Sequence, residues 1–183
     1  ADEGELSGLL ETALQLDGPM AIRYPRSGAS AMPDMPGEPL PVGRWDEVRP
    51  GRDAVIIAIG RMVGAAREAA DLLARENISC AVINARWLKP IDPRLVEEWA
   101  DRYPLILTAE DGVLSGGLGA AVLEALSPAG MAGKVRLAGL PDGFLPQGKA
   151  PDILAAHGLT AEGLATRVRK EVLGLRPTRK AAG

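Results

Sequence analysis

Two short segments of this chain consist almost entirely of apolar residues. Between them, apolar residues recur at the spacing of a helix. Residues 54–59 read AVIIAI, a run rich in β-branched side chains that Gly60 ends. Apolar residues then recur every three or four positions as far as Leu73, which is the period of a helix with one buried face. A second apolar run begins at Ala81. This pattern predicts a strand, a crossover helix and a second strand parallel to the first. Neither strand alternates apolar with polar residues, so we expect both faces of each strand to be covered.

The same alternation of strands and helices continues toward the C-terminus. Asp92 and Pro93 suit the N-cap and the first position of a helix. The further elements that we expect are a helix from Pro93, a strand over 105–108, a helix after the loop 110–119, a strand over 134–140, and helices over 150–157 and from Thr160. The strand over 134–140 alternates apolar and polar residues, as an edge strand does. The order predicts an α/β fold, an open three-layer sandwich with a mostly parallel sheet.

The N-terminal part has a different pattern. Apolar positions predict a helix over about residues 6–14, which residues 17–19 (DGP) end. Residues 20–24 are expected to form a short strand that ends at Pro25. One helix and one strand cannot bury a core, so residues 1–26 are expected to be the end of a preceding domain and the chain a fragment of a longer polypeptide.

The remaining boundaries follow from composition. Residues 27–52 are rich in proline and glycine and are expected to be an interdomain linker, in which residues 40–43 add an edge strand. Residues 53–175 carry the regular pattern of the main domain. Residues 176–183 are expected to be a flexible tail.

Charge, aromatic content and cysteine usage exclude several classes of partner. The net charge of the 183 residues is −3 and aromatic residues make up 3%, which favours neither nucleic acid nor an anionic membrane as a partner. No apolar run is long enough to span a bilayer. Cys80 is the single cysteine and is interpreted as a buried apolar residue rather than a reactive thiol. A lone cysteine fits a reducing compartment, so we expect the cytoplasm.

Three groups of residues are candidates for chemistry, and for each a structural interpretation is favoured. The backbone of residues 116–119 (GGLG) can hold a phosphate, but close packing of a helix start on the sheet is favoured. Glu110 and Asp111 are adjacent carboxylates suited to acid–base work, but a solvated pair or an interface contact is favoured. His157, the only histidine, is expected to bond a carbonyl at a helix end. The sequence offers no metal-ligating cluster.

Arg23 and Arg26 flank the end of the expected strand over residues 20–24. Arginine is the preferred residue for two-pronged recognition of phosphate or carboxylate groups. A surface strand with charged flanks accounts for the same spacing equally well. The spacing alone leaves both interpretations open.

Five motifs stand in order along the chain, at residues 17–26 (DGPMAIRYPR), 40–43, 84–92, 110–119 and 139–148. Together they resemble one family, the 1-deoxy-D-xylulose-5-phosphate synthases of the transketolase superfamily. Residues 17–26 resemble the end of that family's pyrimidine-binding domain. The first and last motifs are fairly specific to these synthases, since transketolases and the beta chains of 2-oxo-acid dehydrogenases are expected to differ there. The main domain would then be a transketolase C-terminal domain.

The resemblance implies a parent enzyme that uses thiamine diphosphate and Mg²⁺ as a homodimer. It would condense pyruvate with glyceraldehyde 3-phosphate, with loss of CO₂, in the non-mevalonate route to isoprenoids, and it would also feed thiamine and pyridoxal synthesis. Arg26 would hold the phosphate of the acceptor, with Arg23 as a second substrate-binding residue. Ser27 departs from the family, where a glycine commonly follows that arginine.

The resemblance also implies what this segment lacks. The cofactor-binding motif and the catalytic residues of the family would lie upstream of residue 1, so the segment alone is expected to be inactive and to support the dimer. The alternative is a free-standing, non-catalytic module of the same fold that binds a partner or a small effector. The C-terminal part of a 2-oxo-acid dehydrogenase beta chain is a third interpretation, which residues 23–26 disfavour.

Overall fold

The centre of the molecule is a five-stranded sheet in the order β1-β3-β2-β4-β5. The structure is a computed structural model that describes residues 1–25 and 38–175. The strands are β1 (Asp46–Arg49), β2 (Ala54–Ala58), β3 (Cys80–Asn84), β4 (Ile106–Val113) and β5 (Val135–Leu140). Strands β2 to β5 run parallel, and β1 pairs antiparallel with β3. The predicted mostly parallel α/β sheet is therefore confirmed.

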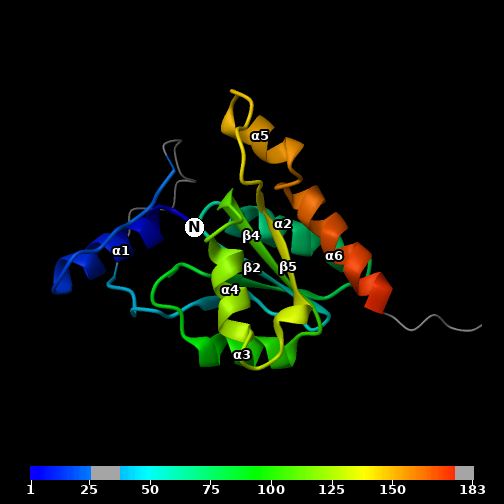
Figure 1. The fold of residues 1–183 in the computed structure, drawn as a ribbon, viewed down its shortest axis with the longest axis horizontal. Coiled ribbons are helices and arrows are strands. Elements are labelled where there is room, and N and C mark those ends of the chain that lie inside the picture. Colours follow the sequence, from blue (N-terminus) through cyan, green and yellow to red (C-terminus); the bar gives the residue numbers. More distant parts are fainter. Residues whose placement is uncertain (26–37, 176–183) are drawn as a thin grey trace, which may run out of the picture.

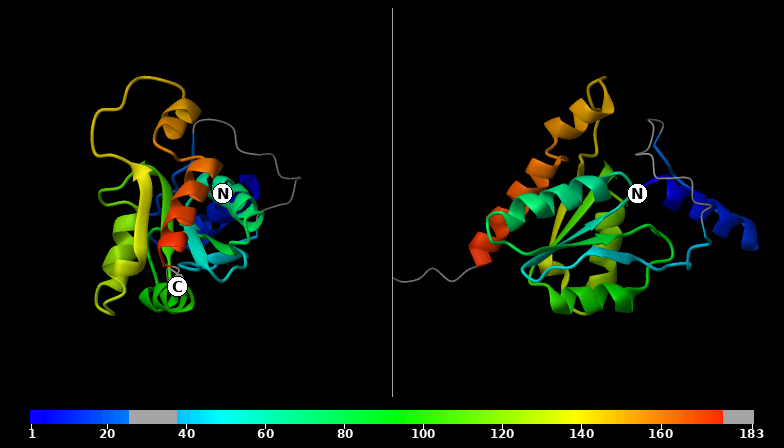
Figure 2. Two further views of the ribbon diagram at one scale, coloured as in Figure 1. Left: turned by 90° about the vertical axis from the view of Figure 1, so that its right-hand side faces the viewer. Right: turned by 180° about the vertical axis from the view of Figure 1, so that it is seen from behind.

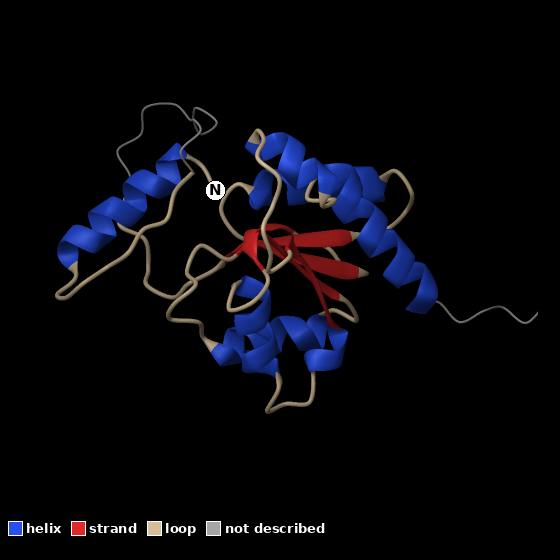
Figure 3. Cartoon of the chain, turned by 45° about the horizontal axis from the view of Figure 1, so that its top comes forward, coloured by secondary structure: helices blue, strands red, loops and turns tan. Residues whose placement is uncertain are grey.

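Helices cover both faces of this sheet and complete the three layers, as Figures 1 and 3 show. Helices α2 (Met62–Ala74) and α6 (Ala161–Leu175) lie on one face, and α3 (Pro93–Arg102) and α4 (Leu118–Leu126) lie on the other. A 3₁₀ helix at Ala132–Lys134 precedes β5, and α5 (Ala150–Ala156) precedes α6. The predicted caps are present: Asp92 accepts a hydrogen bond from the backbone N–H of Arg94, and Thr160 accepts one from that of Gly163.

Strand β2 shows why continuous apolar runs mark the middle of the sheet. All five of its residues are buried. Ile56 packs into the core beneath α2 and α6, whereas Val55 and Ile57 pack into the core beneath α3 and α4. Each face of the strand therefore needs an apolar side chain, and no position is left for the polar residues of a half-exposed strand.

Two of the strand predictions are wrong. Residues 20–24 form no strand, and the edge strand expected at residues 40–43 lies instead at β1. A strand requires a neighbour for its backbone hydrogen bonds, and no described strand runs beside residues 20–24. Near residue 41 proline lacks the N–H that a ladder needs, whereas residues 46–49 can all donate. Strand β4 also extends five residues beyond the expected end at Thr108.

Helix α1 (Glu3–Gln15) forms as predicted, but its leucine stripe is not buried. Leu10 and Leu14 are 51% and 83% exposed. The buried residues of α1 are Gly8 and Thr12, and the hydroxyl of Thr12 accepts a hydrogen bond of 2.7 Å from the backbone N–H of Leu40. Figure 2 shows α1 to one side of the sandwich, outside both helical layers.

The division of the chain into domains remains a prediction that limited proteolysis can test. We expect the first cut between residues 27 and 50, a range rich in proline and glycine in which residues 38–45 form no helix or strand, because proteases prefer segments without regular hydrogen-bonded structure. An early cut within β2, α2 or β3 would contradict the assignment of one domain to this region.

Cys80 is buried, as predicted, and its burial has a chemical consequence. Loss of solvation raises the pKa of the thiol from its ordinary value of 9.0 to about 12. We therefore expect a thiol reagent at pH 8 to modify Cys80 at least a hundredfold more slowly in the native protein than in urea. Because the unfolded thiol ionises at lower pH than the folded one, stability should also fall as the pH rises from about 9 toward 12. Equally fast labelling of both states would contradict this burial.

None of the helices among the described residues is both long and apolar enough to cross a membrane.

Candidate functional site

A cleft of about 980 Å³ lies at the carboxyl edge of the parallel strands. One wall is the N-terminal segment, which contributes Glu5, Leu9 and residues 19–23. The ends of β2 and β4 and the loop after β3 form the rest. Carboxyl edges of open α/β sheets are where such proteins usually bind ligands. The cleft is therefore the candidate site.

Arg23 reaches this cleft although no strand carries it. Its guanidinium lies against Gly112, near the end of β4. If Gly112 carried a side chain, its first carbon would lie 3.3 Å from Nη1 of Arg23 and 3.5 Å from Oε2 of Glu110. Among the described residues Arg23 has no hydrogen bond or ion pair that meets ordinary distance limits. It is a cation that is free to bind an anion. Arg26, the other predicted substrate-binding residue, lies outside the described residues.

Glu110 is buried, so its interpretation as a solvated carboxylate is wrong. It is 5% exposed, and its two carboxylate oxygens accept hydrogen bonds of 3.0 Å from the backbone N–H groups of Leu118 and Gly119. A carboxylate at a helix N-terminus satisfies free N–H groups and complements the helix dipole. Glu110 therefore fixes the start of α4, while Asp111 next to it is partly exposed and lines the cleft.

The glycines of residues 116–119 allow this close approach. A side chain at Gly117 or Gly119 would clash with its neighbours. Its first carbon would lie 2.0 Å from Oε2 of Glu110 at Gly117, and 2.7 Å from a methyl group of Leu137 at Gly119. The prediction that these glycines pack a helix start on the sheet is confirmed. Two of the N–H groups that an anion would need, those of Leu118 and Gly119, are already bound to Glu110.

Glu110→Gln should destabilise the fold by about 1–3 kcal/mol, because the amide offers one acceptor oxygen and turns a donor toward a buried N–H group. Glu124→Gln is the matched control, since Glu124 lies exposed on the same helix. Urea unfolding followed by circular dichroism measures the difference. Equal stability of the two variants would contradict the capping role of Glu110.

The other charges that line the cleft are largely paired. Arg86 forms ion pairs with Glu5 and Asp46, at 2.7 and 2.5 Å. Lys89 lines the cleft and is exposed. With Glu110 bound to backbone groups, the side chains left for a ligand are the cations Arg23 and Lys89 and the carboxylate of Asp111. The cleft therefore suits a small anionic ligand.

The remaining candidates lie outside this cleft. His157 ends α5, where its backbone N–H bonds the carbonyl of Ile153 at 3.3 Å. Within the part of the chain that the structure describes, no three metal-ligating side chains gather.

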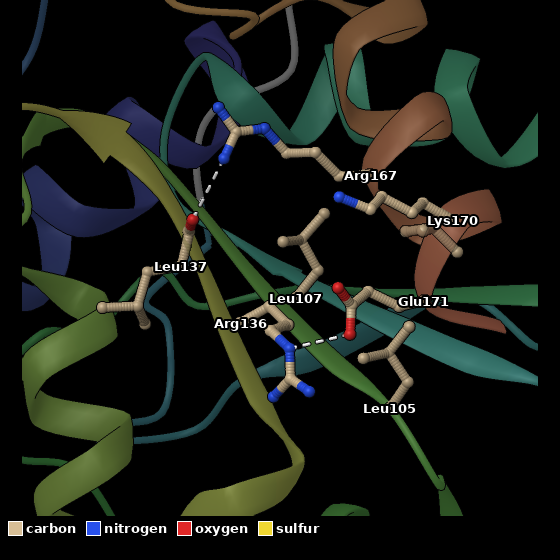
Figure 4. A pocket seen from close by; sticks show the side chains of 8 residues that line it. Leu105, Leu107, Arg136, Leu137, Arg167, Lys170 and Glu171 are labelled. Atoms are coloured by element: carbon tan, nitrogen blue, oxygen red, sulfur yellow. Dashed lines mark hydrogen bonds and ion pairs between the residues drawn. The ribbon is translucent and has the colours of Figure 1, made fainter. Parts of the chain in front are cut away.

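A smaller groove of about 240 Å³ lies between β5 and α6 (Figure 4). Arg136 pairs there with Glu171 at 2.8 Å, and Arg167 donates to the carbonyl of Leu137 at 3.3 Å. Both arginines are engaged in joining α6 to the sheet edge.

Comparison with known proteins supplies the family. The family model for the transketolase C-terminal domain matches residues 43–164, which is most of the chain. The chain belongs to the transketolase C-terminal domain family. The expectation that the main domain is a transketolase C-terminal domain is thereby confirmed.

Curated relatives of this transketolase C-terminal domain carry the family name that its motifs indicate. The 1-deoxy-D-xylulose-5-phosphate synthase of Heliobacterium modesticaldum is 44% identical over 93% of this chain and 26% of its own length. That of Syntrophotalea carbinolica is 44% identical over 92% of this chain and 27% of its own length. The chain thus spans about a quarter of the length of these relatives.

Solved structures agree with this assignment of the transketolase C-terminal domain. A split-gene transketolase, described as an inactive beta4 tetramer, has a TM-score of 0.83 and 33% identity, and it covers 94% of this chain and 56% of its own. A transketolase mutant from Pichia stipitis has a TM-score of 0.53 at 22% identity over 76% of this chain and 21% of its own, which supports the fold alone.

Sequence reasoning missed the pairing of Glu5 with Arg86. Asn84 and Arg86 stand in the motif of residues 84–92, at the end of a buried strand and just after it, which is a position where polar side chains meet a cleft. Nothing in the sequence, however, indicates that Glu5, about eighty positions earlier, is their partner.

Proposed function

We propose that this chain is the C-terminal part of a 1-deoxy-D-xylulose-5-phosphate synthase and that its cleft helps to bind the acceptor substrate. The complete enzyme, a cytoplasmic homodimer, would condense pyruvate with glyceraldehyde 3-phosphate and release CO₂. Its product would enter isoprenoid, thiamine and pyridoxal synthesis. Arg26 and Arg23 would bind the phosphate of glyceraldehyde 3-phosphate.

The observation that carries the binding role is the position of Arg23. Its guanidinium lies in a cleft at the carboxyl edge of the sheet without a carboxylate partner among the described residues, whereas Arg86 in the same cleft is paired twice. An unpaired arginine can form two parallel, charge-assisted hydrogen bonds to a phosphate. Arg26 follows Arg23 by three positions, so both can serve the same ligand.

The described residues do not fit thiamine diphosphate and Mg²⁺. No set of acidic or imidazole ligands gathers among them, and the N–H groups at the start of α4 are bound to Glu110. We therefore propose that the cofactor and its metal are held outside this segment. The part played by these residues is to bind and orient the acceptor and to support the dimer.

A second candidate function is that of a separate, non-catalytic subunit or module. The likeness to a split-gene transketolase favours it, because that protein has a similar fold and only about twice the length of the matched region. The reading frame upstream of Ala1 separates the two candidates. A continuous frame that encodes a thiamine diphosphate motif supports the synthase, and its absence supports the separate subunit.

The binding role can be tested by adding inorganic phosphate to the ¹⁵N-arginine-labelled chain and recording the side-chain signals by NMR. We expect the Nε–H signal of Arg23 to shift and that of Arg44, which is exposed beside Asp46, to stay in place. Arg23→Gln should leave the fold unchanged and weaken the response of Arg26. Equal shifts of all exposed arginines would contradict a site.

A further inference from the structure

A buried polar cluster joins the N-terminal segment to the sheet. The carboxylate of Glu5, in the first turn of α1, lies 2.7 Å from Nε of Arg86 and accepts a hydrogen bond of 2.5 Å from Nδ2 of Asn84. Arg86 also donates through Nη2 to Asp46 of β1 at 2.5 Å. The side chains of Glu5 and Arg86 are only 8% and 11% exposed. The cluster thus connects α1, β1 and the end of β3, and two of its residues, Glu5 and Arg86, line the cleft.

The apolar packing of this segment is partial. Leu9 and Met20 are partly buried against the core beneath α3 and α4, while Leu10 and Leu14 point to solvent. Helix α1 also contacts residues 38–40, through Thr12 and Gly8, and these residues precede the sheet rather than belong to it. Glu5 therefore provides a buried polar link between α1 and the end of β3.

Burial makes this link sensitive to the loss of either partner. Charged groups that are taken out of water are tolerated when they are paired, and the removal of one partner leaves the other buried and uncompensated. Without Arg86, the carboxylate of Glu5 would keep only its contacts with Asn84 and the amino group of Ala1. It would lose the ion pair that offsets its burial, so moving the carboxylate into water would cost less free energy. Opening of the segment would then be opposed less strongly, because solvation of Glu5 requires α1 to move.

We propose that Arg86 is a positioning residue for anion binding in the cleft, a role that rests on the proposed function of Arg23. Glu5 and Arg23 lie on the same wall of the cleft, which is formed by the N-terminal segment. By pairing with Glu5, Arg86 holds that wall against the ends of β2 and β4 and keeps the guanidinium of Arg23 beside Gly112. Because the guanidinium of Arg86 is already paired with two carboxylates, those of Glu5 and Asp46, we assign it to positioning rather than to binding the ligand.

Arg86→Met tests this role because it removes the charge and keeps a similar aliphatic stem. Hydrogen exchange should become at least about tenfold faster at the amides of α1, where local opening is no longer opposed by the ion pair, and should stay unchanged in β2 and β4. Glu5→Gln removes the negative partner of the same ion pair and should also make hydrogen exchange in α1 faster. Arg86→Lys should restore part of the protection, because an ammonium cannot face both carboxylates as a guanidinium does.

The matched control is Arg102→Met. Arg102 pairs with Glu47 at 3.1 Å, is 43% exposed and makes no contact with residues 1–25 that the structure records. It should change neither the exchange of α1 nor the NMR response of Arg23 to inorganic phosphate.

The phosphate titration of the labelled chain separates positioning from direct binding. Arg86→Met should speed exchange in α1 and abolish the shift of Arg23, whereas Arg23→Gln should leave the exchange of α1 unchanged. Faster exchange with an intact phosphate response, or no change in either, would overturn the proposal. If the wild-type chain gives no response to phosphate, the binding role of Arg23 falls, and the positioning role falls with it. The hydrogen-exchange rates of α1 then still show whether Arg86 stabilises the contact of α1 with the sheet.

Discussion

Arg26→Ala should lower the catalytic efficiency of the proposed complete synthase for glyceraldehyde 3-phosphate about ten- to a hundredfold. Hydrogen bonds to charged groups contribute roughly 1.5–3 kcal/mol, and the variant loses one charged, two-pronged donor to the phosphate. The phosphate lies away from the reacting carbonyl but positions it, so part of the loss should appear in kcat. This role of Arg26 comes from the family resemblance, and the position of Arg23 in the cleft supports it.

The reaction with pyruvate provides the internal control for Arg26. Pyruvate has no phosphate, so its decarboxylation to the enzyme-bound intermediate should hardly change. Arg26→Lys should restore only part of the efficiency, because an ammonium keeps the charge but lacks the planar fork. Steady-state kinetics with glyceraldehyde 3-phosphate and with unphosphorylated glyceraldehyde measure the difference. A variant that loses both acceptors equally would show that Arg26 is structural.

The chain alone should bind no thiamine diphosphate and form no product, a complete loss relative to the longer enzyme. The described residues hold no ligand set for the Mg²⁺ that a diphosphate requires, and Glu110 occupies the helix N-terminus that can receive a phosphate. Calorimetry of the chain with thiamine diphosphate and Mg²⁺ should show no heat of binding. The longer protein is the positive control. Micromolar binding by the chain alone would reveal a cofactor site in this segment.

The sheet could be predicted from the sequence because its strands are buried on both faces. Buried parallel strands require continuous apolar residues, and a half-exposed strand or a surface helix would have placed polar residues within the runs at 54–59 and from Ala81. The caps at Asp92 and Thr160 depend only on neighbouring residues and were also predictable. The edge strand β1 was missed, because it is short and charged and its pairing with β3 is antiparallel and non-local.

The cleft was less predictable, because its contacts join residues far apart in the sequence. Glu110 resembled one of two exposed carboxylates, and only the fold shows that its side chain turns inward to α4 while Asp111 lines the cleft. Likewise, Arg86 belongs to a recognisable motif, but its partner Glu5 is set by the docking of α1. Local patterns determine secondary structure here, whereas the ion pairs depend on which segments the fold brings together.

The most direct test of the proposed function is product formation by the longer protein that contains this chain. Pyruvate, glyceraldehyde 3-phosphate, thiamine diphosphate and Mg²⁺ are supplied, and the products are identified by mass spectrometry. We predict 1-deoxy-D-xylulose 5-phosphate and one CO₂ for each molecule formed. Two results would contradict the assignment, each obtained with a folded protein that binds thiamine diphosphate. One is transfer of a two-carbon unit from a ketose instead of from pyruvate, and the other is the absence of any condensation product.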